Sequence, residues 1–513
     1  MAAFSSSCPG WPDSDPAAPW WPHSPGAPSW LVLVSCRLRE VEVAGHKVLL
    51  VRSKMEFSAV GSKCTHAGAS LSKGVLAGNR LRCPWHGACF SIRTGDIEEY
   101  PTLDCLPCFK VTLPLLLSIL HPSLFCLERC RSNENTIMGE TRVSLTGAAA
   151  LVCAETLRQE GFTGRIVMVT KEKHVPYDRT QLSKVCAWPD HAVVRSSEPN
   201  TACCPSLLQV VSVDMQGQKA HFQDGAFQRY DQLLIATGSS PRQLQCPGSD
   251  LENVCSLQTP EDANRILHLA TGKRVVILGA SFIGMEVAAF LSDKSSAICV
   301  VEREEFPFQA VLGPQVGGVA MKVQCCAESS FIHSTVRFHM PVTHFNVFRR
   351  SLSRKAVLAS GEKLPADVVV FMQTNVPRVF AAGDVTSFPV TLFGETTATI
   401  RHWQIAQAHG HIAALNMLKK QKALHTVPFF WTSLLGKSIR YAGYGKGYTE
   451  TVVKGSLEQL KFLVFYIKDD YVIAVASLNF DPMVSLVAEV MYSGRQISKA
   501  EAQSSDTTWM KQA

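Results

Sequence analysis

The sequence lacks the features that mark several broad protein classes. Its 50 Lys and Arg residues against 43 Asp and Glu give a net charge of only +7 over 513 residues. No basic cluster is interleaved with aromatic residues, which argues against nucleic-acid binding. The opening 30 residues have neither the basic and apolar regions of a secretory signal nor the arginine-rich pattern of a transit peptide. Their Pro, Ser, Gly and Trp content predicts a disordered lead over residues 1–30.

The cysteines also form no repeating framework. There are 18 of them, and a chain of this length can fold without disulfides. We therefore expect a reducing compartment and mostly free thiols. The cysteines without an assigned role are Cys89, Cys105, Cys108, Cys126 and Cys130.

A long uninterrupted hydrophobic run is missing as well. Residues 111–127 contain no Asp, Glu, Lys or Arg, but they are few for a membrane span. Pro114, His121 and Pro122 interrupt the segment. We therefore favour a buried or irregular linker over residues 112–139, with membrane association as the alternative.

Strand and helix patterns divide the chain into an all-β part and an α/β part. Residues 39–51 alternate apolar and polar side chains around Gly45, which predicts a β-hairpin, and short strands continue to about residue 111. Later, apolar strands alternate with helices, which predicts parallel sheets in two nucleotide-binding domains. The predicted strands of this part are 165–170, 232–236, 273–278 and 297–302, and the helices are 147–160 and 284–291. Residues 460–467 and 471–476 predict a hairpin in a separate α+β domain at the C-terminus.

The most specific motif lies in the all-β part. Cys64-Thr-His66 is followed, after sixteen residues, by Cys83-Pro-Trp-His86. A Rieske [2Fe–2S] cluster takes two Cys on one iron and two His on the other, and each loop here supplies one of each. Structural zinc is the main alternative, but it more often uses paired Cys and paired His motifs. Unrelated free cysteines are a weaker alternative, since Gly68 lies where a tight ligand loop needs it.

A dinucleotide fingerprint follows the strand over residues 273–278. Gly279-Ala-Ser281-Phe-Ile-Gly284 opens a helix, and Glu302 ends the next strand. The glycines permit a tight turn at the helix N-terminus, where a pyrophosphate binds. Glu302 can bind ribose hydroxyls, which favours NAD over NADP. Ser281 replaces the middle glycine, so a Rossmann unit without a ligand is the alternative.

An earlier fingerprint is damaged. Leu145, Gly147 and Ala150 stand at the three glycine positions, and Leu145 is a poor substitute for the turn glycine. The strand expected before it, over residues 141–145, is also weak in pattern. Glu172 nevertheless stands where a ribose-binding acid is expected.

Other segments indicate a flavin site. Arg179 and Lys184 follow the second strand, and a strand ending in Gly383-Asp384 offers a carboxylate to a ribityl hydroxyl. A helix starting near His402-Trp403 can direct its N-terminal dipole at a reduced flavin. The candidate flavin contacts are Gly147, Glu172, Arg179, Lys184, Thr237, Gly238, Gly383, Asp384 and Trp403.

Several segments resemble one known family. They are KCTHAGASLSKGVLAGNRLRCPWHGACFSIRTGDIEEYP, LVCAETLRQEGF, GMEVAAFL, VFAAGD and GKSIRYAGYG. Over residues 39–493 the chain resembles the Rieske-bearing member of the mitochondrion-associated apoptosis-inducing factor family. The resemblance implies a Rieske domain fused to a two-Rossmann FAD/NAD-linked reductase with a C-terminal α+β interface domain. It also implies FAD and NAD(H) as cofactors, a mitochondrial location and a pro-apoptotic role. A cytoplasmic location is the alternative.

Together these observations predict a multidomain fold. The predicted divisions are a disordered lead (1–30), a Rieske domain (31–111), an apolar linker (112–139), an FAD-binding domain (140–260 and 372–425), an NAD-binding domain (261–371) and an interface domain (426–513). The NAD-binding domain is expected to be truncated, because residues 366–370 run almost directly into residues 372–377, where the family carries a longer segment.

Two functional hypotheses follow. In the first, the chain is an NAD(P)H-dependent oxidoreductase, in which NADH reduces FAD and the cluster passes electrons to an unidentified acceptor. The cofactors perform this chemistry, so no catalytic side chain is assigned. In the second, the chain keeps the cluster but not reductase activity and acts in cell death as a binding protein. A Rieske oxygenase is a weak third reading, because His402, His409 and His411 lack an obvious acidic partner for a mononuclear iron.

Overall fold

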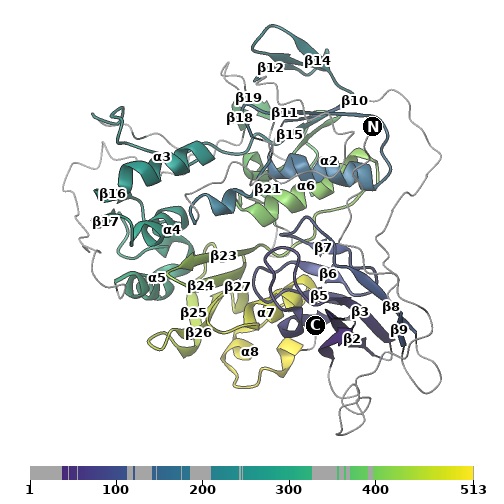
Figure 1. Ribbon diagram of the computed structural model, residues 1–513, viewed down its shortest axis with the longest axis vertical. Helices are drawn as coiled ribbons and strands as arrows, with labels where there is room; N and C mark the ends of the chain where they lie inside the picture. Colours follow the sequence, from purple (N-terminus) through teal and green to yellow (C-terminus); the bar gives the residue numbers. More distant parts are fainter. Residues whose placement is uncertain are drawn as a thin grey trace.

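The computed structural model describes most of the four folded parts of the chain (Figure 1). The described residues are 37–43, 45–54, 56–112, 119–121, 141–145, 147–174, 176–184, 209–241, 244, 247–325, 355–357, 363–365, 370–390 and 397–511. The predicted disordered lead, most of the apolar linker and residues 366–369, at the start of the predicted truncation site, lie outside these residues. In the part of the chain that is described, no helix has the length and apolarity that crossing a bilayer requires.

The N-terminal part is all-β, as predicted, and consists of two antiparallel sheets. The first has the order β1 (Leu38–Val43), β2 (His46–Ser53), β3 (Glu56–Gly61), β8 (Cys108–Thr112) and β9 (Ile119–His121). The second consists of β4 (Val75–Ala77), β5 (Arg80–Arg82), β6 (Cys89–Ser91) and β7 (Ile97–Glu99). Leu49, Val60, Leu81 and Phe90 are fully buried in the core of this part. Both motif loops leave the ends of these short strands.

A parallel sheet forms the centre of the next part. Its order is β11 (Arg165–Val169), β10 (Thr141–Leu145), β15 (Gln232–Ile235) and β20 (Val379–Ala381). The weak strand pattern over residues 141–145 is misleading, because β10 is hydrogen-bonded on both sides, to β11 and β15. Pairing on two edges overrides a poor local propensity. Helices α2 (Ala148–Gln159) and α6 (Trp403–Met417) run side by side along this sheet (Figure 1).

A second Rossmann-like unit follows a short antiparallel meander. The meander is β12 (Val210–Asp214), β13 (Lys219–Phe222) and β14 (Phe227–Arg229). The unit contains α3 (Pro260–Ala270), β16 (Arg274–Leu278), α4 (Phe282–Leu291), β17 (Ala297–Val301) and α5 (Gln309–Cys325). Within the described residues β16 pairs only with β17, and Val276 on β16 is 64% exposed. This strand is therefore less covered than a central Rossmann strand usually is.

The C-terminal part is α+β, as predicted. Its five-stranded sheet has the order β23 (Phe429–Leu434), β24 (Lys437–Gly443), β27 (Tyr471–Leu478), β26 (Lys461–Lys468) and β25 (Glu450–Ser456). The predicted hairpin corresponds to β26 and β27, which pair antiparallel. Helices α7 (Met483–Tyr492) and α8 (Lys499–Gln503) complete this part.

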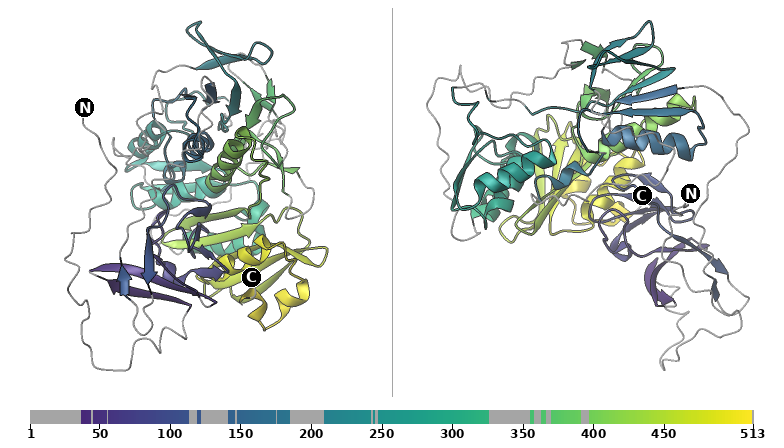
Figure 2. Two further views of the ribbon diagram at one scale, coloured as in Figure 1. Left: turned by 90° about the vertical axis from the view of Figure 1, so that its right-hand side faces the viewer. Right: turned by 45° about the horizontal axis from the view of Figure 1, so that its top comes forward.

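The remaining described elements are short. They are β18 (Lys355–Val357), β19 (Lys363–Pro365), β21 (Phe388–Pro389), β22 (Thr397–Ala398) and the 3-10 turns η1 (Leu71–Lys73), η2 (Arg179–Gln181), η3 (Gly383–Val385) and η4 (Thr508–Lys511). Figure 2 shows the N-terminal sheets, in purple, against the yellow C-terminal part from two directions. This packing brings the motif loops to β23, β24 and α7.

Candidate iron–sulfur and flavin site

The two Cys-His motifs occupy tight loops. The Cys64 amide donates to Ala69 O at 2.8 Å, and the Cys83 amide donates to Ala88 O at 2.7 Å. Gly68 and Gly87 have φ angles of 72° and 79°. A side chain at either glycine would be strained in this left-handed conformation. The glycines therefore let each chain segment turn back within a few residues of its ligands.

The four predicted ligands converge in two pairs. The Cys64 and Cys83 thiols lie close enough for each to shift the pKa of the other, which lowers that of Cys64 and raises that of Cys83. The Nδ1 atoms of His66 and His86 are 3.0 Å apart. Burial lowers the pKa of His66 below its ordinary value and, with positive charge from neighbouring groups, lowers that of His86 to about 2. Both rings are therefore neutral and present a lone pair for a metal.

This donor set fits a [2Fe–2S] cluster. Two thiols on one side and two imidazoles on the other match the ligands of the two irons. Among the described residues, no three His, Cys, Asp or Glu side chains gather around a point that could hold a single metal ion. A cluster with two ligands on each iron therefore fits this pairing better than a structural zinc ion, which would need all four ligands around one point.

The predicted flavin contacts gather at the ends of β10, β15 and β20. Gly147 is the N-cap of α2, and this helix start has no side-chain cap, so its amides can bind phosphate. The half-buried carboxylate of Asp384 accepts from Ser239 Oγ at 2.8 Å. Burial raises the pKa of Asp384 above its ordinary value, although the Ser239 bond opposes this. A ribityl hydroxyl would supply a further donor, so the residues fit FAD.

A buried glutamate that sequence reasoning missed organises Lys184. Glu286 Oε2 accepts from Lys184 Nζ at 2.8 Å and from the Ser183 hydroxyl, and Oε1 accepts from Thr432 Oγ1 at 2.7 Å. Glu286 lies on α4, so this group joins the flavin, nicotinamide and C-terminal parts. The GMEVAAFL segment contains Glu286, but an acidic residue inside an apolar helix was the only signal.

Other predicted flavin contacts have partners of their own. The Arg179 guanidinium pairs with the Glu172 carboxylate and also donates to Gln258 O at 2.7 Å. Thr237 is exposed, and Gly238 has a φ of 68°. Trp403 is half-buried and is the first residue of α6. The structure therefore brings these predicted residues to one region.

The predicted NAD turn has close backbone packing. A side chain at Gly284 would place its Cβ 2.0 Å from Gly279 O, so only glycine fits. Ser281 is the N-cap of α4 and makes no capping bond, which leaves the helix amides available to a pyrophosphate. Glu302 accepts from the Ala280 amide at 2.6 Å. A ribose hydroxyl would have to share this carboxylate, so the residues fit NAD with a rearranged or shared Glu302.

Trp431 on β23 connects the two sites. Its ring centroid is 4.2 Å from that of His86 and 5.4 Å from that of His66. It is also 5.2 Å from the ring centroid of His402, the N-cap of α6. Burial, with positive charge from Lys184, lowers the pKa of His402 to about 3. The iron–sulfur ligands therefore lie one aromatic ring away from the start of the predicted flavin helix. Sequence reasoning missed Trp431, which no motif marks.

Comparison with known proteins identifies the family. The chain is 45% identical to apoptosis-inducing factor 3 of Mus musculus, over 91% of this chain and 84% of that protein. The chain belongs to the apoptosis-inducing factor 3 family. This confirms the predicted resemblance to a Rieske-bearing member of the apoptosis-inducing factor family.

Three domain families match this member of the apoptosis-inducing factor 3 family. Residues 33–110 match the Rieske [2Fe-2S] domain, 146–371 pyridine nucleotide-disulphide oxidoreductases and 429–512 the reductase C-terminal domain. The predicted fold class and the cofactor set of a [2Fe–2S] cluster, FAD and NAD(H) are thereby confirmed. The domain boundaries and individual site residues stay predictions.

More distant relatives agree with this assignment. The ferredoxin–NAD(+) reductase component of the biphenyl dioxygenase system of Paraburkholderia xenovorans is 27% identical, over 70% of this chain and 94% of that protein. The covalent putidaredoxin reductase–putidaredoxin complex matches with a TM-score of 0.60 and 22% identity, over 72% and 96% of the two chains. This structural likeness supports the fold alone. With the domain matches, the sequence relatives identify this family member as an NAD(P)H-dependent oxidoreductase.

Proposed function

We propose that this protein passes electrons from NADH through FAD to its own Rieske cluster and then to an unidentified acceptor. When bound, FAD takes two electrons from NADH and can release them singly, and the cluster takes one at a time. The observation that carries the proposal is Trp431, whose ring contacts both His86 and His402.

The protein's own residues would hold the cofactors in place. Gly279 and Gly284 would let the NAD pyrophosphate approach α4, and Gly147 would do so for FAD at α2. Lys184 would present its ammonium group at the flavin, since Glu286 holds it from behind. Asp384 would accept a hydrogen bond from the ribityl chain. Trp431 and the neighbouring side chains would exclude water between the flavin and the cluster.

The family name adds a cellular expectation to this proposal. Apoptosis-inducing factor 3 relatives support a mitochondrial location and a pro-apoptotic role, with electron transfer as the chemical activity. A ferredoxin-like acceptor is consistent with the bacterial relative's role as a ferredoxin–NAD(+) reductase component. The alternative is a binding protein that has kept the cluster and lost reductase activity. The replaced turn glycine at Leu145 favours this alternative.

One titration distinguishes the two. The full chain is purified anaerobically, its visible spectrum is recorded, and NADH is added in steps. The proposal expects bound flavin and bleaching of both flavin and cluster absorbance. A cluster without flavin, bleached by dithionite but not by NADH, would refute the proposal and support the binding protein. A colourless protein containing zinc would overturn the iron–sulfur assignment itself.

A further inference from the structure

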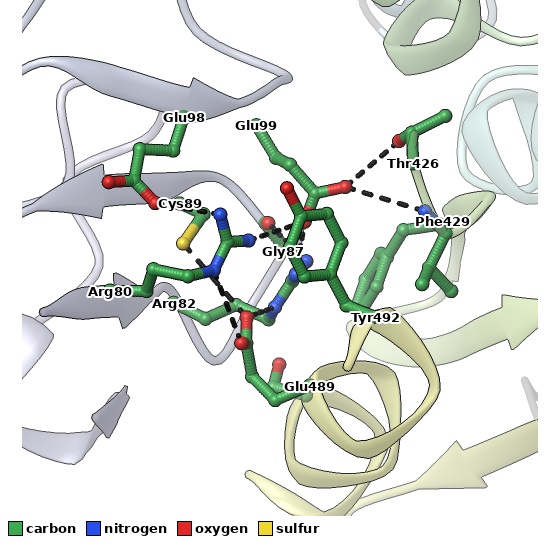
Figure 3. Close-up of polar contacts among 12 residues, drawn as sticks. Arg80, Arg82, Gly87, Cys89, Glu98, Glu99, Thr426, Phe429, Glu489 and Tyr492 are labelled. Carbon is green, nitrogen blue, oxygen red and sulfur yellow. Dashed lines mark hydrogen bonds and ion pairs between the residues drawn. The ribbon is translucent and has the colours of Figure 1, made fainter. Parts of the chain in front are cut away.

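Arg82 is a buried charge beside the iron–sulfur ligands. It ends β5, directly before Cys83, and its side chain is 1% exposed. Its guanidinium pairs with Glu99 on β7 and with Glu489 on α7, and it also donates to Gly87 O at 3.0 Å. Figure 3 shows these groups around the guanidinium. Arg82 therefore contacts both ends of the second ligand loop, which runs from Cys83 to Gly87. It also contacts the C-terminal domain.

Arg80 extends the same network by two residues along β5. It pairs with Glu99 at 3.0 Å, with Glu489 at 3.4 Å and with Glu98 at 2.7 Å. The Arg80 guanidinium also lies 3.8 Å from the centroid of the Tyr492 ring on α7 (Figure 3). Two arginines of the Rieske domain thus face a glutamate and an aromatic ring of the C-terminal domain.

Glu489 is as buried as its partner, with 3% exposure. Burial alone would raise the pKa of Glu489, but attraction to Arg82 and Arg80 lowers it below its ordinary value. Arg82 lies between two carboxylates, those of Glu489 and Glu99, and an arginine side chain stays protonated in proteins. Both groups are therefore charged. Removing one of them leaves an uncompensated buried charge, which is strongly unfavourable.

The C-terminal domain also binds the second ligand loop directly. Ser485 Oγ on α7 donates to Cys83 O at 3.1 Å, and Arg440 Nε on β24 donates to Trp85 O at 2.8 Å. Asp481 holds Arg440 at 2.7 Å. With the Arg82 bond to Gly87, every second carbonyl of the loop from Cys83 to Gly87 accepts a hydrogen bond.

These contacts differ from those of a mobile domain. Interfaces between domains that move are usually polar, hydrated and only moderately buried. Here a charged pair is almost fully buried, and a Cβ at Gly87 would lie 2.7 Å from the Phe429 ring. The close backbone approach and the buried charges require one fixed arrangement of the two domains.

We propose that α7 and β24 position the second ligand loop of the cluster through Ser485, Arg440 and the Glu489–Arg82 pair. The same contacts hold the Rieske domain in one fixed position on the reductase, which we call the dock. The side chains of the C-terminal domain then shape the cluster environment, as outer partners of metal ligands do. This proposal rests on the proposed electron route. Its test reduces the cluster directly with dithionite, so it needs neither NADH nor electron transfer from the flavin. A failed NADH titration and a failed positioning test are therefore distinguishable.

The direct bond to the loop is tested in the full chain with two serine variants on one helix. Ser485→Ala removes the donor to Cys83 O, whereas Ser493→Ala removes a local bond to Val490 O at the end of α7. We expect Ser485→Ala to lower the midpoint potential and change the electron paramagnetic resonance g values. The lost donor no longer stabilises the more negative, reduced cluster. Ser493→Ala should match wild type. Equal spectra and potentials for all three proteins would overturn the positioning role.

The fixed dock is tested by hydrogen exchange of residues 82–89 and 483–492. Glu489→Gln removes the charge that α7 presents to Arg82, whereas Glu98→Gln makes the same change within the Rieske domain. We expect at least about tenfold faster exchange in both segments for Glu489→Gln and little change for Glu98→Gln. Unchanged protection in Glu489→Gln would overturn the dock. If Glu489→Gln does not fold, the Ser485→Ala comparison still decides whether α7 shapes the cluster.

Discussion

At the scale of single residues, Trp431 gives the most direct test of electron transfer from the flavin to the cluster. Replacing it by leucine removes the aromatic ring that contacts both His86 and His402. We expect Trp431→Leu to slow reduction of the cluster after NADH addition by roughly 10- to 100-fold, the scale of loss when reacting groups lose their positioning. Stopped-flow absorbance of the flavin and cluster bands measures this rate. Flavin bleaching itself should stay fast.

Trp85 provides a matched control for this variant. Its ring also flanks His86, at 6.2 Å between centroids, but it is 41% exposed and makes no ring contact with His402. Trp85→Leu should therefore leave the rate from flavin to cluster near the wild-type value. An equal loss in both variants would show that Trp431 matters only for the shape of the ligand loop. The dithionite-reduced cluster spectrum verifies that each variant keeps its cluster.

At the scale of elements, the pair α2 and α6 supports the predicted flavin site. Gly410 on α6 packs against α2 so closely that an added Cβ would lie 2.1 Å from Ala149 O. Gly410→Ala must therefore separate the helices, and we expect about 1–3 kcal/mol of destabilisation, as in other overpacked cores. Because Gly147 begins α2 and Gly383 lies against both helices, the flavin content should fall as well. Thermal unfolding and the flavin-to-protein ratio measure these effects.

Gly318 on α5 is the control for the helix packing. A Cβ there would meet no atom closer than 3.7 Å, at the Phe306 ring. Gly318→Ala should be neutral or stabilise the protein by up to about 1 kcal/mol, because alanine lowers the entropy of the unfolded chain. A stable, fully flavinated Gly410→Ala would mean that the two helices can separate freely and that their contact does not shape the site.

Local motifs could be predicted from the sequence, whereas the residues at the interface between the Rieske and C-terminal domains could not. The ligands Cys64 and His66 are visible because their spacing is imposed by one local loop, and the start of α6 at Trp403 agrees with the helix predicted near His402-Trp403. The β10 strand was weakly predicted, since its pairing partners are distant in sequence. Trp431 and Glu489 were missed because each lies on an ordinary strand or helix. Their role arises only when a domain more than 300 residues away packs against them.

At the scale of the whole molecule, the Rieske domain also contacts the FAD-binding part. Gln407 on α6 donates to Thr102 O at 3.5 Å, and the rings of Tyr100 and His411 lie 6.1 Å apart. Glu155 of α2 lies in the same contact region. Burial, with repulsion from Asp104, raises the pKa of Glu155 from 4.5 to about 7. The folded protein therefore binds a proton here that the unfolded chain releases at lower pH.

The direction of the pH effect follows from this raised pKa. The stabilising contribution of protonated Glu155 is fully present below about pH 4.5 and is lost as the pH rises through about 7. Above that pH, ionised Glu155 destabilises the interface by at most about 3 kcal/mol. Glu155→Gln keeps the shape of the protonated form. We therefore expect this variant to unfold at a higher temperature than wild type near pH 8 and at the same temperature near pH 4.

Scanning calorimetry of the full chain at the two pH values measures the effect. Glu160→Gln is the matched control, because Glu160 follows the same helix but pairs with Lys420 near the surface. It should not raise the unfolding temperature at either pH, since an exposed pair contributes little. A gain for Glu155→Gln that is equal at both pH values would show that the carboxylate is not titrating at this interface. A gain confined to higher pH would mean that the contact between the Rieske and FAD-binding parts weakens as the solution becomes alkaline, while the Arg82–Glu489 dock does not.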